Sequence, residues 1–404
     1  MFEASQRLGR LRVAAAIASL LAGVACNPPR VLVVGLDGAN WQVMEPLIEA
    51  GHLPTIGSIV TSGARFDLDC APAYPLAACF CPPVWTSIAT GRPFSDHRIG
   101  GFYTPSYARG VKALWNVLHE HGGRSTLIGY RGTWPPESDA DIVITEPSTQ
   151  VAGGELYAAF PVSVHPGASM SLTHTRPLGL LEDLGLLPSS VPESERLPAW
   201  LPFAEDRVSM QALLRIEARR AGERSRARVP DLTMILLHAI DRSEHMMWGT
   251  IQSEQWAPID VESLLDQADL YPGPSFNPPP IGWSRVPAQY QEADEWLAEL
   301  LAVTSYDYVV FVSDHGMTRG EPGALPGAHG FDSPESHLGI LSITGPGIVA
   351  NQHLGEASVL DVAPTVAYLL GLPIGRDLPG RVLSESFGDS PLFYLSAREV
   401  ASWE

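Results

Sequence analysis

The stretch RVLVVGLDG, residues 30–38, is a short apolar run that ends in an acidic residue. Continuous apolar runs rich in valine are typical of parallel strands that are buried on both faces. Asp37 follows the run directly, and α/β sheets bind their ligands at the carboxyl ends of such strands. The stretch predicts a central strand with Asp37 at the ligand edge. An Asp at this place can instead cap a helix, here one that begins near residue 41.

Three more apolar runs share this pattern: Leu232–Ile240, Tyr308–Ser313 and Leu338–Thr344. The first leads into Asp241 and the second into Asp314. Segments with helical periodicity alternate with the runs, as in a sheet that is covered by helices on both faces. We therefore predict an α/β fold, namely a three-layer α/β/α sandwich with a mostly parallel central sheet.

Two regions, at about 150–205 and 250–287, lose this periodicity and are rich in Pro and other loop-forming residues. Long irregular segments of this kind are typical of functional insertions. We interpret them as an inserted cap within a catalytic domain that covers residues 27–404.

The chain of 404 residues carries 45 acidic and 26 basic residues, a net charge of −19. No block rich in Lys or Arg is present, so binding of a nucleic-acid polymer through its phosphates is not expected. An anionic substrate would therefore need local positive charge, which bound metal ions would provide.

Residues 1–26 have the features of an export signal. Three arginines precede the apolar run Val13–Val24, which is too short to span a bilayer. Cys26, at the end of the signal, resembles the attachment cysteine of a lipoprotein. We predict export to the periplasm or cell envelope, with a lipid anchor on Cys26 or simple cleavage as the alternatives.

Of the other cysteines, Cys81 opens the stretch CPPVWTSIATG, residues 81–91. Proline is favoured in the first turn of a helix, so a helix is expected to begin beside Cys81, with its free N–H groups and positive dipole end available to an anion. Cys81 is a candidate nucleophile, or else an ordinary buried cysteine. A Cys70–Cys79 disulfide would constrain the loop before it and leave Cys81 free.

The acidic strand ends are accompanied by histidines. His245 lies four residues after Asp241, His315 follows Asp314 directly, and His329 lies in the sequence GAHGFD. Asp and His together suit a borderline cation such as zinc. Six such groups at strand ends would bind two metal ions that share the nucleophile, as displacement at phosphorus requires.

These motifs, in this order, resemble those of the alkaline phosphatase superfamily, close to its type I phosphodiesterase/nucleotide pyrophosphatase branch. The resemblance covers most of residues 30–385 and rests on VVGLDG, the helix that ends in TG, DxxxH, SDHGM, GxHGFD and DVAPTVAYLLGLP. It implies that Asp241, His245 and His329 hold one metal ion and that Asp37, Asp314 and His315 hold the other. The ions would be Zn²⁺, with Mn²⁺ or Ca²⁺ as alternatives. His238 matches no ligand position and is expected only to pack within its strand.

The chain departs from the family at two positions. The nucleophile of the branch is usually Thr, but Cys81 stands there. Sulfatases convert a Cys in the pattern C-x-P-x-R to formylglycine, and here Trp85 occupies the Arg position. Nucleotide pyrophosphatases carry an Asn about two dozen residues after the nucleophile, where this chain offers Phe102, so a nucleotide substrate is not implied.

We predict an exported, metal-dependent phosphohydrolase, most simply a phosphodiesterase, that forms a covalent phosphoryl-enzyme on Cys81 or, failing that, Thr86. Its substrate would be a small-molecule, lipid or glycan phosphoester. A sulfatase-like ester hydrolase, an envelope phosphotransferase and an inactive metal-binding lipoprotein are the alternatives.

Overall fold

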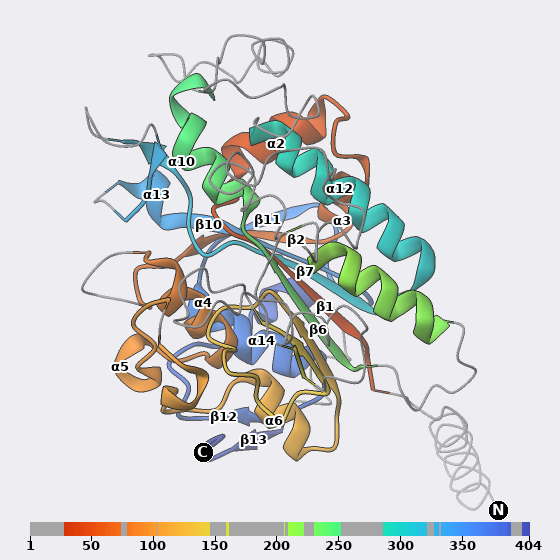
Figure 1. Cartoon of the computed structure of the whole chain (residues 1–404), viewed down its shortest axis with the longest axis vertical. Helices are drawn as coiled ribbons and strands as arrows, with labels where there is room; N and C mark the ends of the chain where they lie inside the picture. Colours follow the sequence, from red (N-terminus) through yellow and green to blue (C-terminus); the bar gives the residue numbers. More distant parts are fainter. Residues whose placement is uncertain are drawn as a thin grey trace, which may run out of the picture.

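A computed structural model describes residues 28–73, 79–102, 104–145, 159–160, 206, 209–221, 230–251, 286–320, 327–330, 333–388 and 398–404. The architecture is a nine-stranded sheet with helices on both faces (Figure 1). In spatial order the strands are β11 (Gln352–Ser358), β2 (Ala64–Asp69), β10 (Leu338–Thr344), β7 (Tyr308–Val312), β1 (Val31–Leu36), β6 (Leu232–Leu237), β3 (Ser125–Ile128), β4 (Ile142–Ile144) and β5 (Ala159–Phe160).

The centre of the sheet is parallel. β1 pairs in parallel with β7 on one side and with β6 on the other, and β3 and β4 continue in the same direction beyond β6. β10 runs antiparallel to both of its neighbours, and β5 runs antiparallel to β4. The predicted mostly parallel sheet is thereby confirmed, with β1 and β7 as direct neighbours.

The helices of the described residues include α2 (Trp41–Glu49), α3 (Pro54–Thr61), α4 (Cys81–Thr90), α5 (Phe94–His97), α6 (Leu114–Glu120), α10 (Ala239–Ile251), α12 (Val286–Val303), α13 (Pro334–His337) and α14 (Val362–Leu369), and residues 209–221 are helical as well. One layer contains α4, α6 and α14, and the opposite layer contains α2, α3, α10 and α12 (Figure 1). The predicted three-layer α/β/α sandwich is confirmed.

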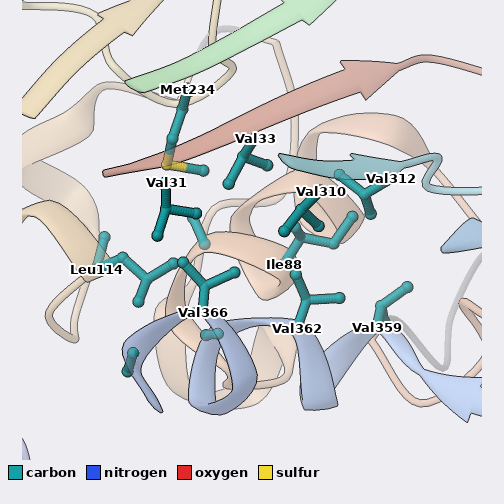
Figure 2. Close-up of a cluster of buried hydrophobic side chains, with 14 of the residues drawn as sticks. Val31, Val33, Ile88, Leu114, Met234, Val310, Val312, Val359, Val362 and Val366 are labelled. Carbon is teal, nitrogen blue, oxygen red and sulfur yellow. The ribbon is translucent and has the colours of Figure 1, made fainter. Parts of the chain in front are cut away.

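β1 shows why the chain folds in this way. All six of its residues are buried, because successive side chains of a strand point to opposite faces and both faces are covered. Val31 and Val33 join the core on the α4 side, where Figure 2 shows them near Ile88. Leu32 and Val34 join the core on the α2 side. A buried strand of this kind needs no polar alternation, which is why its sequence is continuously apolar.

Several sequence predictions fall on residues that the structure does not describe. The export signal with Cys26 lies within residues 1–27, and the proposed cap insertions lie almost wholly within undescribed segments, so both stay predictions. Within the described ranges, no helix has both the length and the apolar character needed to cross a membrane.

Gly35 allows β1 to approach its neighbours closely. A Cβ at this position would lie 2.7 Å from Leu236 Cδ1 and 2.8 Å from Trp85 Cη2, both in the core. Gly35→Ala should therefore lower the free energy of unfolding by about 1–3 kcal/mol through overpacking. Urea denaturation measures this loss. Gly101→Ala is the control, since its Cβ would meet nothing closer than Phe80 at 4.0 Å; equal stability of the two variants would contradict the prediction.

Candidate active site

Three acidic side chains meet where the parallel strands end. Asp37 follows β1 directly, Asp314 comes two residues after the end of β7, and Asp241 lies in the first turn of α10, the helix that follows β6. Backbone bonds hold these segments together: Asp241 N–H donates to Asp37 O at 2.9 Å, and Asp37 N–H donates to Leu237 O at 2.9 Å. The helix-cap alternative for Asp37 is wrong, because Asn40 caps α2 by accepting from Val43 N–H.

The structure brings together the six predicted metal-binding residues and Cys81. They form two groups whose ligand atoms all lie within 4.8 Å of one another, namely Asp241, His245 and His329, and Asp37, Cys81, Asp314 and His315. A third such group, Cys81, His315 and His329, links the two. Within the first group, Asp241 Oδ1 is 3.3 Å from His245 Nε2 and 3.6 Å from His329 Nε2. Within the second, His315 Nε2 is 3.6 Å from Asp37 Oδ1 and 3.4 Å from Cys81 Sγ.

Each of the three carboxylates has one buried oxygen without a hydrogen-bond partner: Asp37 Oδ1, Asp241 Oδ1 and Asp314 Oδ2. Buried polar atoms in proteins are nearly always paired, because an unpaired one costs free energy. The unpaired oxygens are also the atoms that lie near the histidine nitrogens of the two groups. This donor set fits divalent cations.

The three histidines are oriented as metal ligands usually are. In each, Nδ1 lies near a backbone carbonyl oxygen: His245 at 3.0 Å from Gly327, His315 at 2.9 Å from Gly316, and His329 at 3.1 Å from Cys79. A carbonyl accepts but cannot donate, so Nδ1 carries the proton and Nε2 keeps its lone pair. Burial lowers the pKa of His329 to about 2, with help from the neighbouring histidines, and burial also lowers the pKa of His315. The rings of His315 and His329 are therefore neutral.

Like charges in this small buried volume shift the titration of its groups. Burial and the nearby carboxylates raise the pKa of Asp314 well above its usual value, and they do the same for the Cys81 thiol. Burial would also raise the pKa of Asp37, but Arg131 and His238 beside it hold that pKa well below its usual range. Without further positive charge, Cys81 is therefore a neutral thiol.

Cys81 is the first residue of α4, with Phe80 as the N-cap. Pro82 and Pro83 have no N–H, and Val84 N–H already donates to Phe80 O at 3.2 Å. The expectation of several free N–H groups at this helix end is thus wrong, since the prolines that start the helix also remove its donors. Thr86 is buried, and its hydroxyl donates to Pro82 O at 2.8 Å. The hydroxyl is therefore directed at the backbone of its own helix.

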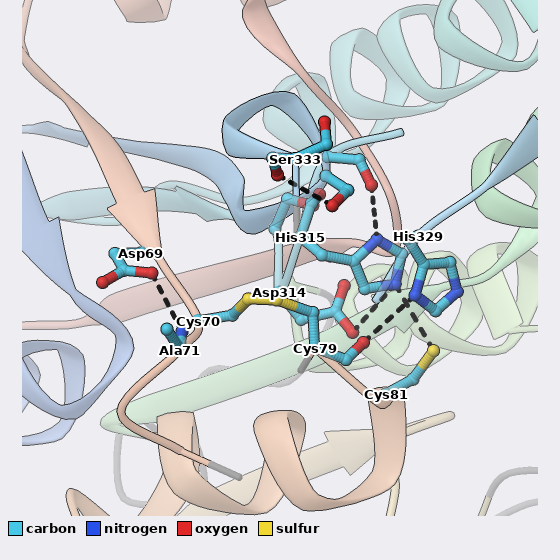
Figure 3. The surroundings of a disulfide bond; sticks show 12 residues. Asp69, Cys70, Ala71, Cys79, Cys81, Asp314, His315, His329 and Ser333 are labelled. Carbon is cyan, nitrogen blue, oxygen red and sulfur yellow. Dashed lines mark hydrogen bonds and ion pairs between the residues drawn. A yellow bond between two sulfur atoms is a disulfide. The ribbon is translucent and has the colours of Figure 1, made fainter. Parts of the chain in front are cut away.

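The predicted Cys70–Cys79 disulfide is present, and Cys81 is the free cysteine among those that the structure describes (Figure 3). The bridge restrains the backbone of Cys79, whose carbonyl oxygen accepts from His329 Nδ1. One end of the disulfide therefore lies between the candidate nucleophile and a candidate metal ligand.

Sequence reasoning missed two residues of this site. Arg131 donates to Asp37 Oδ2 at 2.8 Å, and His238 Nδ1 lies 2.9 Å from the same oxygen. The expectation that His238 only packs in its strand is wrong, because the strand ends at Leu237 and the next residue turns toward Asp37. Arg131 lies three residues after β3 ends at Ile128, and a cation placed so soon after a buried strand is the signal that would have revealed it.

Comparison with known proteins identifies the family of this chain. The model of the type I phosphodiesterase/nucleotide pyrophosphatase family matches residues 31–324, and the chain belongs to this family. The family is metal-dependent, and membership makes this chain a hydrolase of phosphate esters. No curated protein matches the chain in sequence.

Solved structures share the fold at low sequence identity. The phosphonate monoester hydrolase SpPMH from Silicibacter pomeroyi has a TM-score of 0.52 and 15% identity, over 90% of this chain and 77% of its own. That of Agrobacterium radiobacter has a TM-score of 0.51 and 18% identity, over 89% and 77%. BT1596, a 2-O GAG sulfatase, has a TM-score of 0.53 and 13% identity, over 89% and 74%. At these identities the likeness shows the shared α/β/α fold.

His329→Ala should lower the metal content and the activity together, because it removes one nitrogen ligand from the Asp241 group. Elemental analysis of the purified protein, set beside its rate of ester hydrolysis, measures both. His353→Ala is the matched control, since this histidine is exposed and pairs with Asp67 instead. Unchanged metal stoichiometry in His329→Ala would remove His329 from the ligand set.

Arg131→Met should make metal retention more sensitive to acid. Metal ions and protons compete for Asp37, and Arg131 is the strongest influence that lowers its pKa. Without that charge, Asp37 takes up a proton at a higher pH, so the pH at which half of the metal is lost should rise. Equilibrium dialysis across pH measures this midpoint.

Arg109→Met is the control for the Arg131 variant. Arg109 is likewise an arginine with a side chain of low exposure, 6%, that pairs with a carboxylate, at 2.6 Å from Glu137, and lies over an aromatic ring, that of Trp115. It belongs to neither ligand group. An equal shift of the midpoint in both variants would contradict the role given to Arg131.

Proposed function

We propose that the protein is a metal-dependent phosphodiesterase in which Cys81 attacks phosphorus. The observation that carries this proposal is the position of Cys81 Sγ. It lies within 4.8 Å of ligand atoms from both groups, those of His315 and His329 as well as those of Asp37 and Asp314. A nucleophile shared between two cation sites is the arrangement used for displacement at phosphorus.

Two zinc ions suit the donor set of carboxylates, imidazoles and a thiol. Asp241, His245 and His329 would hold one ion, and Asp37, Asp314 and His315 the other. When bound, the ions would favour the thiolate form of Cys81 and neutralise charge on the phosphoryl oxygens.

The remaining steps of the reaction use side chains of this protein. The Cys81 thiolate forms a bond to phosphorus while the bond from phosphorus to the leaving ester oxygen breaks, and that oxygen leaves with a proton from solvent. Water then attacks phosphorus and releases one proton to solvent, the sulfur–phosphorus bond breaks, and the thiolate is restored. Arg131 keeps Asp37 ionised and oriented through Oδ2, which leaves Oδ1 to face the ligand cluster.

The same geometry argues against Thr86 as the attacking group. Its hydroxyl is engaged with Pro82 O and faces the helix backbone, whereas the thiol of Cys81 faces the cluster. Trp85, which stands where sulfatases carry Arg, is fully buried. These observations favour an unmodified thiol over formylglycine.

We also propose that the protein is exported and acts in the cell envelope on a small-molecule, lipid or glycan phosphoester. The Cys70–Cys79 disulfide supports export, because such bonds persist in oxidising compartments and are rare in the cytosol. The export signal and the lipid anchor at Cys26 rest on the sequence alone.

The variant series Cys81→Ala, Cys81→Thr and Thr86→Ala tests the nucleophile, with zinc-loaded enzyme and an aryl phosphodiester as substrate. Cys81→Ala should lose at least about a thousandfold in kcat and keep most of its metal, since the other ligands remain. Cys81→Thr should retain activity through its hydroxyl, and Thr86→Ala should have a mild effect.

Two further measurements separate this proposal from its alternatives. The mass of the Cys81 peptide should correspond to an unmodified cysteine, and a sulfate ester should be a poor substrate. Full activity of Cys81→Ala would show that another group attacks. A formylglycine mass with sulfate ester turnover would identify a sulfatase instead.

A further inference from the structure

One aromatic side chain at the edge of the candidate active site is open to solvent. In the part of the chain that the structure describes, the large exposed apolar side chains are Phe102, Tyr107 and Val303. Phe102 is 51% exposed, and its ring lies beside Phe80 and Arg131. The position of Phe102 therefore calls for a functional explanation.

Two contacts place the Phe102 ring against the site from different directions. Its centroid lies 5.4 Å from that of Phe80 in an edge-to-face arrangement, and Phe80 directly precedes Cys81. The guanidinium carbon of Arg131 lies 4.8 Å from the Phe102 centroid, and Arg131 donates to Asp37. One phenyl ring thus bridges the residue before the candidate nucleophile and the cation beside a candidate metal ligand.

The two contacts also hold the ring in place. Edge-to-face packing and a cation over an aromatic face are both favourable geometries. A ring held in this way contributes apolar contact to a ligand without first losing conformational freedom. Arg131 is 4% exposed, so the ring covers the cation while its own remaining surface stays open.

We propose that Phe80 and Phe102 form an apolar wall that holds a hydrocarbon substituent, preferably aromatic, on the ester group that stays on phosphorus. This inference rests on the proposed function. In-line displacement places the leaving group on the side of phosphorus opposite the nucleophile. Phe80 is adjacent to Cys81 in the chain, so the wall flanks the attacking side. It is therefore the retained ester group that reaches the wall.

Two diesters with the same leaving group test this inference: phenyl p-nitrophenyl phosphate and methyl p-nitrophenyl phosphate. Both are monoanions that release p-nitrophenolate, so only the retained group differs. Wild-type enzyme should prefer the phenyl ester. Phe102→Ala should lower kcat/KM for the phenyl ester by about tenfold, mainly through KM, and change that for the methyl ester by less than about twofold.

Two further variants complete the experiment. Phe102→Leu keeps an apolar side chain without a ring, so it should retain part of the phenyl preference. Tyr107→Ala removes the other exposed aromatic residue in this region and should leave both esters unchanged, since Tyr107 is 80% exposed and is not part of the wall.

The possible failures are distinguishable. If Phe102→Ala lowers turnover of both esters equally, or keeps the phenyl preference, the apolar wall is wrong while the proposed function stands. If the wild-type enzyme, loaded with zinc, hydrolyses neither ester, the proposed function fails and this inference fails with it.

Discussion

The structure depends on the concentration of negative charge at one buried edge of its sheet. Because β7, β1 and β6 run parallel and side by side, the segments that follow them bring Asp314, Asp37 and Asp241 together. Carboxylates this close in a medium of low polarity repel one another strongly. Arg131 offsets part of this charge, and the unpaired carboxylate oxygens indicate that cations offset the rest.

Hydrogen bonds from the surrounding backbone and the disulfide fix the orientation of the clustered side chains. Asp206 accepts from the N–H groups of His238 and Ala239, which caps the start of α10, the helix that carries Asp241 and His245. The three candidate ligand histidines donate from Nδ1 to backbone carbonyls, so their orientation is set by the main chain. The disulfide adds a covalent restraint at one of those carbonyls. Most of the precision of the site therefore comes from the backbone.

Cys81 is the feature that distinguishes this site chemically. In its buried and acidic surroundings the thiol is neutral, and two cations at the neighbouring groups would reverse that preference. Cys81, the proposed nucleophile, would thus become reactive only when metal ions are bound. This dependence couples metal binding to reactivity through electrostatics.

The sequence by itself predicted the sandwich, the positions of its buried core strands and the residues that the structure gathers into the candidate ligand groups. These follow from local patterns, since apolar runs mark buried strands and the residues after them meet at one edge. β11 (Gln352–Ser358) escaped prediction because an edge strand with polar residues lacks that pattern. Only the tertiary structure showed the contacts of Arg131, His238 and Phe102, because these contacts join segments far apart in the chain. Phe80 and Phe102 meet 22 positions apart, and Arg131 meets Asp37 across 94 positions. Contacts between residues so far apart in the sequence cannot be predicted from local spacing.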